Sequence, residues 1–290
     1  MKRAIAIVGC GTIGTTLGRL FAEAGYPIAG VASRRIESAR TAAEFIGTSN
    51  YSDNSAHITF DADIVFITTT DICIEPVCDE IAQNRAFKKG AFVFHCSGAL
   101  PSGILRSARH CGAYTGSIHP LQSVASVKEA LCTIAGCTCV FEGEPEVLLT
   151  ARELVRDIGA DFMQIGERDK PLYHAAAVVA SNYLVTLVRV ATELNEIIGI
   201  SGRSSAKGLL CLIRGTLDNL EKLGISDALT GPIARGDIGT IASHIDAIKR
   251  RAPHLLSLYK ALGEMTVSIA GANGKLDTDT IEGMQTLLAA

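Results

Sequence analysis

The chain opens on Ile5-Ala6-Ile7-Val8-Gly9-Cys10-Gly11-Thr12-Ile13-Gly14, a short apolar run that leads into the pattern G-x-G-x-x-G. A helix-like stretch follows directly. Gly9 permits a tight turn, Gly11 lets the backbone approach a pyrophosphate, and Gly14 lets a helix pack closely on the strand. The backbone N–H groups of Thr12 and Ile13 would stand at the positive end of that helix, where a phosphate binds. The order of strand, glycines and helix therefore predicts a dinucleotide-binding turn.

The composition is that of a globular chain large enough for two hydrophobic cores. The sequence has 290 residues, of which 48% are hydrophobic and 20% charged, and its net charge is −3. This balance gives no basic surface for nucleic acid or an anionic membrane. No uninterrupted apolar run reaches the ~18 residues of a membrane span, and the N-terminus has a strand pattern and no signal-peptide pattern. We expect a cytoplasmic protein without nucleic-acid or membrane partners.

The cysteines do not predict a metal site. Their number, nine, is odd, and no secretory signal precedes them, so we expect reduced thiols. Cys132, Cys137 and Cys139 are close in sequence, but they form no C-x-x-C pair and no H-x-x-x-H accompanies them. Packing in the core is therefore the preferred interpretation.

A regular alternation of apolar runs and helix-like stretches extends over residues 1–167. The predicted strands cover residues 4–8, 27–32, 64–68, 91–96, 114–119, 138–141 and 161–165. Strands that are almost entirely apolar and separated by helix-length segments indicate a parallel sheet covered on both faces. We predict the α/β class, with an N-terminal doubly wound domain of the Rossmann type over residues 1–167 that binds the dinucleotide.

The pattern changes after residue 167, and residues 168–290 are predicted to form an all-α domain. Helices are expected over residues 172–198, 203–223, 238–251, 253–270 and 278–288. The first of these is apolar on most of its faces, so we expect it to be buried, either inside its own bundle or against another subunit. We favour a homodimer, in which this domain serves both substrate binding and dimerisation.

The end of the second predicted strand indicates which dinucleotide is bound. An NAD site carries an Asp or Glu about 20 residues after the glycines, which accepts the ribose hydroxyls. This chain has Ser33, Arg34 and Arg35 there instead. A hydroxyl and two guanidinium groups would bind a 2′-phosphate through charge-assisted hydrogen bonds, and a solvated basic turn is the structural alternative. We therefore predict NADP as the cofactor.

Polar residues follow the predicted strands at the carboxyl edge of the sheet, where ligands bind in this class of fold. Thr68, Thr69 and Thr70 end one strand. We expect them to line the cofactor, with turn formation as the structural alternative. Ser97 and Gly98 end the next strand, which suits a hydroxyl held near the nicotinamide and a backbone that passes close to it.

His119 ends the strand after that and precedes a proline, which favours an extended backbone. An imidazole can exchange a proton near neutral pH. A catalytic role for His119 and a structural one are weighed equally at this point.

The predicted all-α domain contributes further polar candidates. His174 and Ser181 are seven residues apart on one predicted helix and share a face, with Asn182 beside them. This polar seam predicts either a hydrogen bond between helices or one wall of a substrate site. Arg235 lies in a loop rich in Gly and Pro and is suited to clamp a substrate carboxylate. Asp237 is expected to cap the helix that follows.

Several of these segments recur, in this order, in a known family. They are the glycine pattern at 9–14, the turn at 97–98, SIHPLQ at 117–122, the helix with His174 and the Ser-Asn-Tyr run at 181–183, and TGPIARGD at 230–237. The chain resembles the Rossmann-like plus DUF2520 proteins, predicted NADP-dependent oxidoreductases, over nearly its whole length up to about residue 260. Ketopantoate reductases and pyrroline-5-carboxylate reductases are similar in overall plan, but their lysine or Ser-Pro-Gly signatures are absent here.

The resemblance implies an oxidoreductase that moves hydride between NADP(H) and a small carbonyl, alcohol or imine. His119 would exchange the proton and Ser97 would steady the substrate oxygen, as in prephenate dehydrogenases, which similarly place a Ser after one strand and a His-Pro after the next. Arg235 would hold a carboxylate, with His174 and Asn182 as further candidates. An NADP(H)-binding redox sensor or scaffold without turnover is the alternative. A prephenate- or arogenate-type dehydrogenase is a weaker one, because Leu-Gln-Ser at 121–123 replaces the small, Gly-containing turn of those enzymes.

Overall fold

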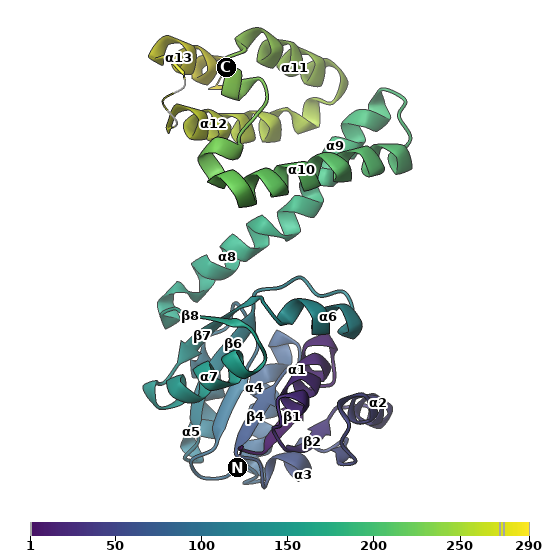
Figure 1. The fold of residues 1–290 in the computed structure, drawn as a ribbon, viewed down its shortest axis with the longest axis vertical. Helices are drawn as coiled ribbons and strands as arrows, with labels where there is room; N and C mark the ends of the chain where they lie inside the picture. The colour runs from purple at the N-terminus through teal and green to yellow at the C-terminus, as the bar shows by residue number, and fades with distance from the viewer. Residues whose placement is uncertain (1, 273, 275, 290) are drawn as a thin grey trace. The chain divides into compact units, whose positions relative to one another are not determined.

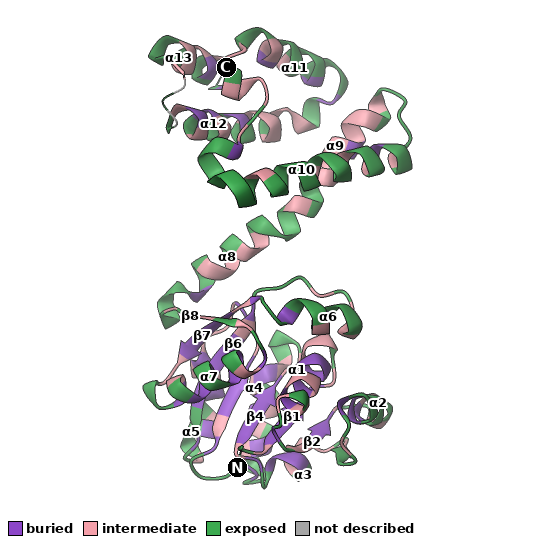
Figure 2. Cartoon of the chain, in the orientation of Figure 1, coloured by how far each residue is buried: buried purple, intermediate pink, exposed green. Residues whose placement is uncertain are grey.

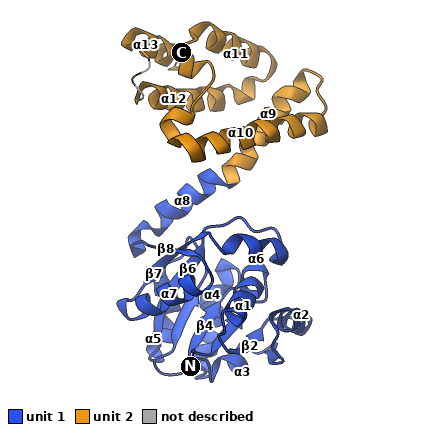
Figure 3. Ribbon diagram, in the orientation of Figure 1, with its two compact units in different colours: residues 1–181 blue, residues 182–290 orange. Residues whose placement is uncertain are grey.

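The structure is a computed structural model that describes residues 2–272, 274 and 276–289 of the chain. The chain forms two compact units, residues 1–181 and residues 182–290, and each is considered by itself (Figure 3). The division follows Ser181, which is later in the chain than the domain boundary predicted at residue 167. The first helix after the sheet therefore belongs to the same unit as the sheet.

In the described part of the chain, the first unit contains an eight-stranded sheet with the order β3-β2-β1-β4-β5-β6-β7-β8 (Figure 1). Its strands are β1 Ile5–Val8, β2 Ile28–Ala32, β3 Tyr51–Ser52, β4 Ile64–Ile67, β5 Phe92–His95, β6 Tyr114–Pro120, β7 Thr138–Gly143 and β8 Asp161–Gln164. The central pairs are parallel: Ile5 of β1 lies opposite Ile64 of β4, which lies opposite Phe92 of β5. The predicted α/β class with a Rossmann-like sheet is confirmed. The short β3 escapes prediction because its two residues give no apolar run.

One pair of neighbours departs from the predicted all-parallel arrangement, because β6 and β7 run antiparallel. A parallel return would have to carry the chain back along β6, whose seven residues span roughly 23 Å. The intervening helix α6 (Val127–Ile134) has eight residues and extends only roughly 12 Å. This helix does not cover the length of β6, and β7 enters the sheet at the end at which β6 leaves.

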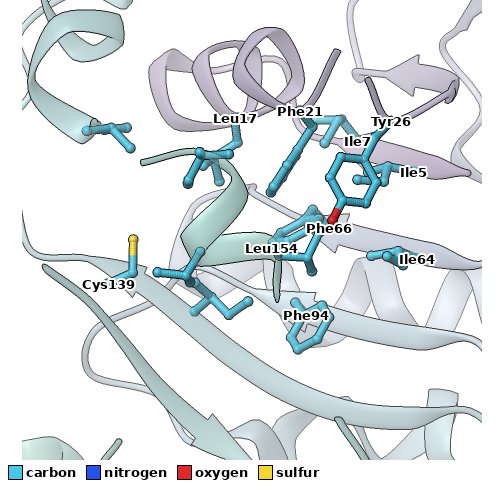
Figure 4. Packing of buried hydrophobic residues seen from close by; sticks show 14 of the residues in the cluster. Ile5, Ile7, Leu17, Phe21, Tyr26, Ile64, Phe66, Phe94, Cys139 and Leu154 are labelled. Carbon is cyan, nitrogen blue, oxygen red and sulfur yellow. The ribbon is translucent and has the colours of Figure 1, made fainter. Parts of the chain in front are cut away.

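Helices cover both faces of the sheet, as its apolar strands predict, and the buried residues concentrate on the strands (Figure 2). Besides α6, the helices of this unit are α1 Thr12–Glu23, α2 Ile36–Ile46, α3 Ser55–Thr59, α4 Asp71–Gln83, α5 Arg106–His110, α7 Pro145–Asp157 and α8 Lys170–Ala180. Ile5 and Ile7 of β1 enter one hydrophobic core together with Phe66 (Figure 4). Ala6 and Val8, which alternate with them, enter the core on the opposite face.

The described residues of the second unit form helices and no strand, so the predicted C-terminal helical region is confirmed. Its α-helices are α9 Asn182–Ile197, α10 Gly202–Ala228, α11 Ile238–Arg251, α12 Leu256–Ala272 and α13 Thr278–Ala289. A small core of Ile241, Val267, Met284 and Leu288 joins α11, α12 and α13.

The single helix predicted over residues 172–198 is wrong, because the structure contains two helices there. Ser181, with φ −113° and ψ −66°, separates α8 from α9. Serine and the following Asn182 have low helix propensity, because their side chains compete for backbone hydrogen bonds. Two residues of the polar seam noted in the sequence, Ser181 and Asn182, thus lie where the helix breaks, whereas His174 lies within α8.

The expected burial of this apolar stretch is also not found within the chain. Among the described residues, Lys170 alone is buried in α8, and Thr192 alone in α9. By its length and composition alone, the stretch Glu167–Ile197 is long and apolar enough to cross a membrane as a helix. A single copy of the chain therefore leaves apolar side chains of α8 and α9 exposed. Such a surface is typical of a site that another molecule covers.

Candidate active site

The glycine-rich turn after β1 has the close contacts that its pattern predicts. Gly9 has φ +112°, and a Cβ atom placed on it would lie 2.7 Å from the backbone of Thr68 and Thr69. A Cβ atom on Gly14 would overlap the carbonyl oxygen of Gly9. At Gly11, by contrast, no described atom outside Gly11 and its two chain neighbours lies within 4 Å of the corresponding position. Gly9 and Gly14 are required for packing, whereas the space beside Gly11 is open to a ligand.

A cavity of about 420 Å³ adjoins this turn. The predicted cofactor residues that line it are Gly9, Gly11, Ser33, Arg34, Arg35, Thr68, Thr69 and Thr70. Thr68 donates its hydroxyl proton to the carbonyl oxygen of Gly9 at 2.7 Å, so this side chain holds the turn. The hydroxyl oxygen of Thr69 is buried and has no hydrogen-bond partner in the described part of the chain.

The groups around this cavity fit the phosphates of a dinucleotide. The helix α1 begins at Thr12, so the N–H groups of Thr12 and Ile13 lack partners inside the helix. They lie beside the open space at Gly11, and Arg34 and Arg35 add positive charge to the same cavity. The unpaired hydroxyl of Thr69 adds a donor. Anionic oxygens would satisfy all of these groups.

The hydroxyl of Ser97, which follows β5, takes part in three hydrogen bonds. Its hydroxyl donates to Oδ2 of Asp71 at 2.8 Å and accepts from the N–H groups of Ala99 and Leu100 at 3.2 and 3.0 Å. A hydroxyl has one donor and two acceptor positions, so all of them are in use. Ser97 would have to break one of these bonds to steady a substrate oxygen. Its role in the structure is to fix the turn.

His119, Tyr173 and His174 lie together beside Gly98. Nδ1 of His119 is 2.7 Å from the phenol oxygen of Tyr173, and the ring centroids of His119 and His174 are 6.3 Å apart. A Cβ atom on Gly98 would lie 2.8 Å from a ring carbon of each histidine. The missing side chain of Gly98 therefore leaves room for both imidazole rings. The strand end, the turn and the start of α8 meet at this point.

Nε2 of His119 is free to meet a ligand. It has no hydrogen-bond partner in the described part of the chain, and it is not one of the buried unpaired atoms. The ring nitrogens of His174 likewise have no hydrogen-bond partner among the described residues and are not among the buried unpaired atoms. Both imidazoles can therefore bind polar groups of a small molecule.

Burial keeps His119 uncharged near neutral pH. Desolvation, aided by the Lys170 ammonium group and the ring of His174, lowers the pKa of His119 from the usual 6.5 to about 4, and Asp71 opposes this effect. Burial likewise raises the pKa of Tyr173 to about 12. The pair is thus a neutral imidazole hydrogen-bonded to a protonated phenol.

Sequence reasoning misses several residues of this site. Tyr173 and Asp71 give no signal of their own, since each is one of several similar residues near a predicted helix start. Glu142 does carry a signal, because it is a charged residue at the end of an apolar strand and needs a partner when buried. Lys170 does not stand out, since it follows the charged run Glu167-Arg168-Asp169. Asp53, which also lines the cofactor cavity, follows the short strand that has no apolar pattern.

Two predicted site residues, Asn182 and Arg235, belong to the second unit. Asn182 is exposed at the start of α9, and Arg235 is exposed at the end of the short 3-10 helix Ile233–Arg235. Asp237 caps α11 by accepting a hydrogen bond from the N–H group of Thr240 at 3.0 Å, as predicted. The roles of Asn182 and Arg235 in substrate binding stay predictions.

Two family models match the sequence. Residues 1–120 match the Rossmann-like domain, and residues 137–266 match the domain of unknown function DUF2520. No curated protein matches the chain.

Solved structures share the fold over almost the whole chain. Protein TM1727 from Thermotoga maritima is 24% identical, with a TM-score of 0.76 over 93% of this chain and 99% of that one. BF3122 from Bacteroides fragilis, provisionally named an NADP oxidoreductase, is 21% identical, with a TM-score of 0.70 over 93% and 98% of the two chains. The Plasmodium falciparum pyrroline carboxylate reductase, solved with NADP bound, is 14% identical, with a TM-score of 0.58 over 98% of each chain. The chain therefore consists of a Rossmann-like domain followed by a DUF2520 domain, on a fold shared with NAD(P)-dependent reductases and dehydrogenases.

Proposed function

We propose that this protein is an NADP(H)-dependent oxidoreductase that transfers hydride to or from a small carbonyl, alcohol or imine substrate. The observation that carries the proposal is the neutral imidazole of His119, hydrogen-bonded to Tyr173 and free at Nε2, in the same compact unit as the glycine-rich turn. Reduction of a carbonyl needs a proton at the oxygen, and a positioned imidazole supplies it. A domain that only bound a dinucleotide would have no use for such a pair.

The basic residues of the cofactor cavity support NADP over NAD. Arg34 and Arg35 line the same cavity as Gly11, and guanidinium groups bind phosphate oxygens through paired hydrogen bonds. Asp53 lines this cavity too and would repel a phosphate, so we assign the 2′-phosphate to the side of the arginines. When NADP(H) is bound, its nicotinamide ring supplies or accepts the hydride.

The proton path follows from the hydrogen bond at His119. In the reducing direction the carbonyl carbon gains the hydride, and the carbonyl oxygen gains a proton from Nε2 of His119. Tyr173 donates its proton to Nδ1 as Nε2 releases its own, since the two atoms are already 2.7 Å apart. The proton then returns from Nδ1 to the phenolate oxygen as solvent reprotonates Nε2, which restores both groups. The ring stays neutral before and after the step, as a pKa of about 4 requires. The same protons move in reverse when an alcohol is oxidised.

Three further residues are our proposed substrate ligands. Arg235 is assigned to a substrate carboxylate, because its exposed guanidinium group can donate two parallel hydrogen bonds. His174 and Asn182 are assigned to other polar groups of the substrate. His174 has free ring nitrogens next to His119, which makes it the better supported of the two.

The proposal is tested by comparing His119→Ala with the wild-type protein. A thermal-shift screen in saturating NADPH first identifies oxo acids, imines or hydroxy acids that raise the melting temperature, since a ligand of the native state stabilises it. We expect turnover of such a compound to fall to background in His119→Ala while the Kd for NADPH stays within about twofold. Unchanged turnover would remove His119 from the mechanism.

Two other outcomes of the screen would redirect the proposal. NADPH binding with no second ligand and no turnover would favour a redox sensor or scaffold. Turnover of prephenate or arogenate would favour that class of dehydrogenase.

We also propose that the protein is a cytoplasmic homodimer that associates through α9 and α10. These two helices pack on each other and leave many large apolar side chains exposed. Among them are Tyr183, Val185, Leu212, Leu217 and Leu223. Monomeric soluble proteins seldom expose so much apolar surface, and a second copy would bury it under two-fold symmetry.

The oligomeric state is measured by light scattering after size exclusion. We expect a particle of two 30.5 kDa chains that dissociates when Leu212 and Leu217 are both replaced by Glu, with NADPH binding retained. A wild-type protein of the mass of one chain would refute the dimer.

A further inference from the structure

A charged lysine is buried directly behind the candidate active site. The side chain of Lys170, the first residue of α8, is 2% exposed. Its Nζ donates hydrogen bonds to the carbonyl oxygen of Ser97 at 3.0 Å and to the hydroxyl of Ser117 at 2.6 Å. The same atom lies 4.0 Å from Oε2 of Glu142, with which it forms an ion pair.

The partner carboxylate of Glu142 is fully engaged as well. It accepts hydrogen bonds from the N–H group and the hydroxyl of Ser102, both at 2.7 Å. The hydroxyl of Ser117 bridges the pair, because it accepts from Lys170 and donates to Glu142 at 3.4 Å. Burying two charges in this way is costly, and well-packed apolar residues would stabilise a fold equally well. The pair must therefore be explained by the geometry that it imposes.

That geometry links the two elements that carry the candidate catalytic groups. Lys170, Tyr173 and His174 stand at positions i, i+3 and i+4 of α8 and share one face of the helix. Ser117 and His119 are two residues apart on β6 and share one face of the strand. The hydrogen bonds Lys170–Ser117 and Tyr173–His119 are thus two adjacent links between the same helix and the same strand.

The third contact of the lysine reaches the turn against which both imidazoles pack. The carbonyl of Ser97 forms the peptide bond to Gly98, and the Cα of Gly98 faces His119 and His174. One ammonium group therefore holds the helix, the strand and the turn at a fixed separation.

We propose that Lys170 is a positioning residue for His119: paired with Glu142, it fixes α8 against β6 and the Ser97–Gly98 turn, so that Tyr173 meets Nδ1 of the imidazole and Nε2 is left for the substrate. This inference deepens the proposed function and rests on it for the role of Nε2. It concerns a residue that neither touches the substrate nor lines the cofactor cavity as described.

The same lysine affects the charge of the imidazole. The titratable and charged groups around His119 are Lys170, Tyr173 and His174 from α8, Asp71 from α4 and His95 from β5. Of these, Lys170 is mainly in its cationic form at neutral pH, although burial lowers its pKa from 10.5 to about 8. Its positive charge lowers the pKa of His119 and disfavours the imidazolium form.

The test observes the ring of His119 directly by NMR of the full-length protein labelled with ¹⁵N-histidine. The variant Lys170→Met/Glu142→Gln removes both charges together and leaves neither one unpaired. We expect the pKa of His119 to rise by about one unit and its tautomer to become averaged, because the bond to Tyr173 is loosened. Lys170→Arg keeps the cation and should hold the pKa of His119 closer to the wild-type value than the double variant does.

The control is Lys128→Met, which removes an exposed lysine of α6 and should leave the His119 signals unchanged. If the double variant lowers the melting temperature but leaves the pKa and tautomer of His119 as in the wild type, Lys170 is merely structural and the proposal is overturned. If the double variant does not fold, Ser117→Ala replaces it and must also shift the His119 tautomer. The NMR measurement needs neither substrate nor NADPH, so its result is separate from the success or failure of the proposed activity.

Discussion

Gly98 and His119 are in such close contact that a single methyl group would not fit between them. The position of a Cβ atom on Gly98 lies 2.8 Å from Cε1 of His119 and equally close to a ring carbon of His174. The backbone conformation of Gly98 does not require a glycine, because its φ is not positive. The glycine is needed for the space that it leaves to the two rings.

The variant Gly98→Ala is therefore expected to fold and to lose activity. The added methyl group must displace His119, and a misplacement of about 1 Å can cost roughly 100-fold in turnover. The cofactor turn should be unaffected, so the Kd for NADPH should stay near the wild-type value. Gly239→Ala is the matched control, because a Cβ atom at this position on α11 would meet Asp237 at 3.7 Å, an ordinary contact distance. Full activity in Gly98→Ala would contradict the assigned contact.

Removing the phenol oxygen of Tyr173 should slow turnover without weakening NADPH binding. In Tyr173→Phe, Nδ1 of His119 loses its partner at 2.7 Å and with it the donor that keeps the ring neutral while Nε2 releases its proton. A loss of roughly 100-fold in kcat is expected for a general acid–base contribution of this kind. Tyr114→Phe, at a half-exposed strand residue, serves as the control. Equal kcat values for the two variants would exclude the proton path.

Acid should destabilise the fold because two buried histidines resist protonation. Burial lowers the pKa of His95 to about 3 and that of His119 to about 4, from 6.5 in the unfolded chain. Below pH 6.5 the unfolded chain binds protons that the folded one does not, so the free energy of unfolding falls as the pH drops toward these values. For the fully buried His95 the loss is roughly 3 kcal/mol at about pH 4.

Urea denaturation at a series of pH values measures this slope. The variant His95→Asn retains an acceptor for the N–H group of Ser97 and cannot be protonated, so its unfolding free energy should depend less on pH. His57→Asn, at an exposed histidine, should behave like the wild type. A slope that is the same in His95→Asn and the wild type would assign the acid sensitivity to other groups.

Replacing both Arg34 and Arg35 by Ser should change the choice of dinucleotide. The 2′-phosphate of NADPH loses its charged partners, and we expect its Kd to rise by about 10-fold to 100-fold, as for the loss of one or two charge-assisted hydrogen bonds. The Kd for NADH should stay nearly constant, since NADH has no such phosphate. Fluorescence titration of both nucleotides gives the two values, and Arg40→Ser on α2 is the control. If the affinities for NADPH and NADH fell equally, the 2′-phosphate would not be bound by these arginines.

The predictable part of this molecule is the part governed by local sequence pattern. Gly9 and Gly14 meet the contacts that their spacing requires, and the apolar strands form a sheet covered on both faces. The antiparallel direction of β7 is not a local property, because it depends on the path that the whole connection from β6 takes over the sheet. The same is true of the break at Ser181, where a modest loss of helix propensity decides between one helix and two.

The candidate site could be predicted only where a residue type implies its own chemistry. His119 stood out as an imidazole at a strand end, whereas Tyr173 gained its role solely by lying 2.7 Å from it. Ser97 shows the opposite case: its position was correct for a catalytic hydroxyl, but Asp71 and two backbone N–H groups already occupy it. Hydrogen-bond saturation of this kind is a property of the folded turn and has no sequence signature.

The occupied hydroxyl of Ser97 has a consequence for chemical modification. An oxygen whose proton and both lone pairs are engaged in hydrogen bonds is a poor nucleophile. Acylating and phosphonylating reagents should therefore not modify this serine. Nε2 of His119 is no nucleophile either, because the neutral ring carries its proton on Nε2 when Nδ1 accepts the hydrogen bond of Tyr173. His95 is fully buried, with both ring nitrogens engaged by Ser97 and Pro101. A ligand designed for this site would therefore present a hydrogen-bond acceptor to Nε2 of His119 and would gain nothing from an electrophile.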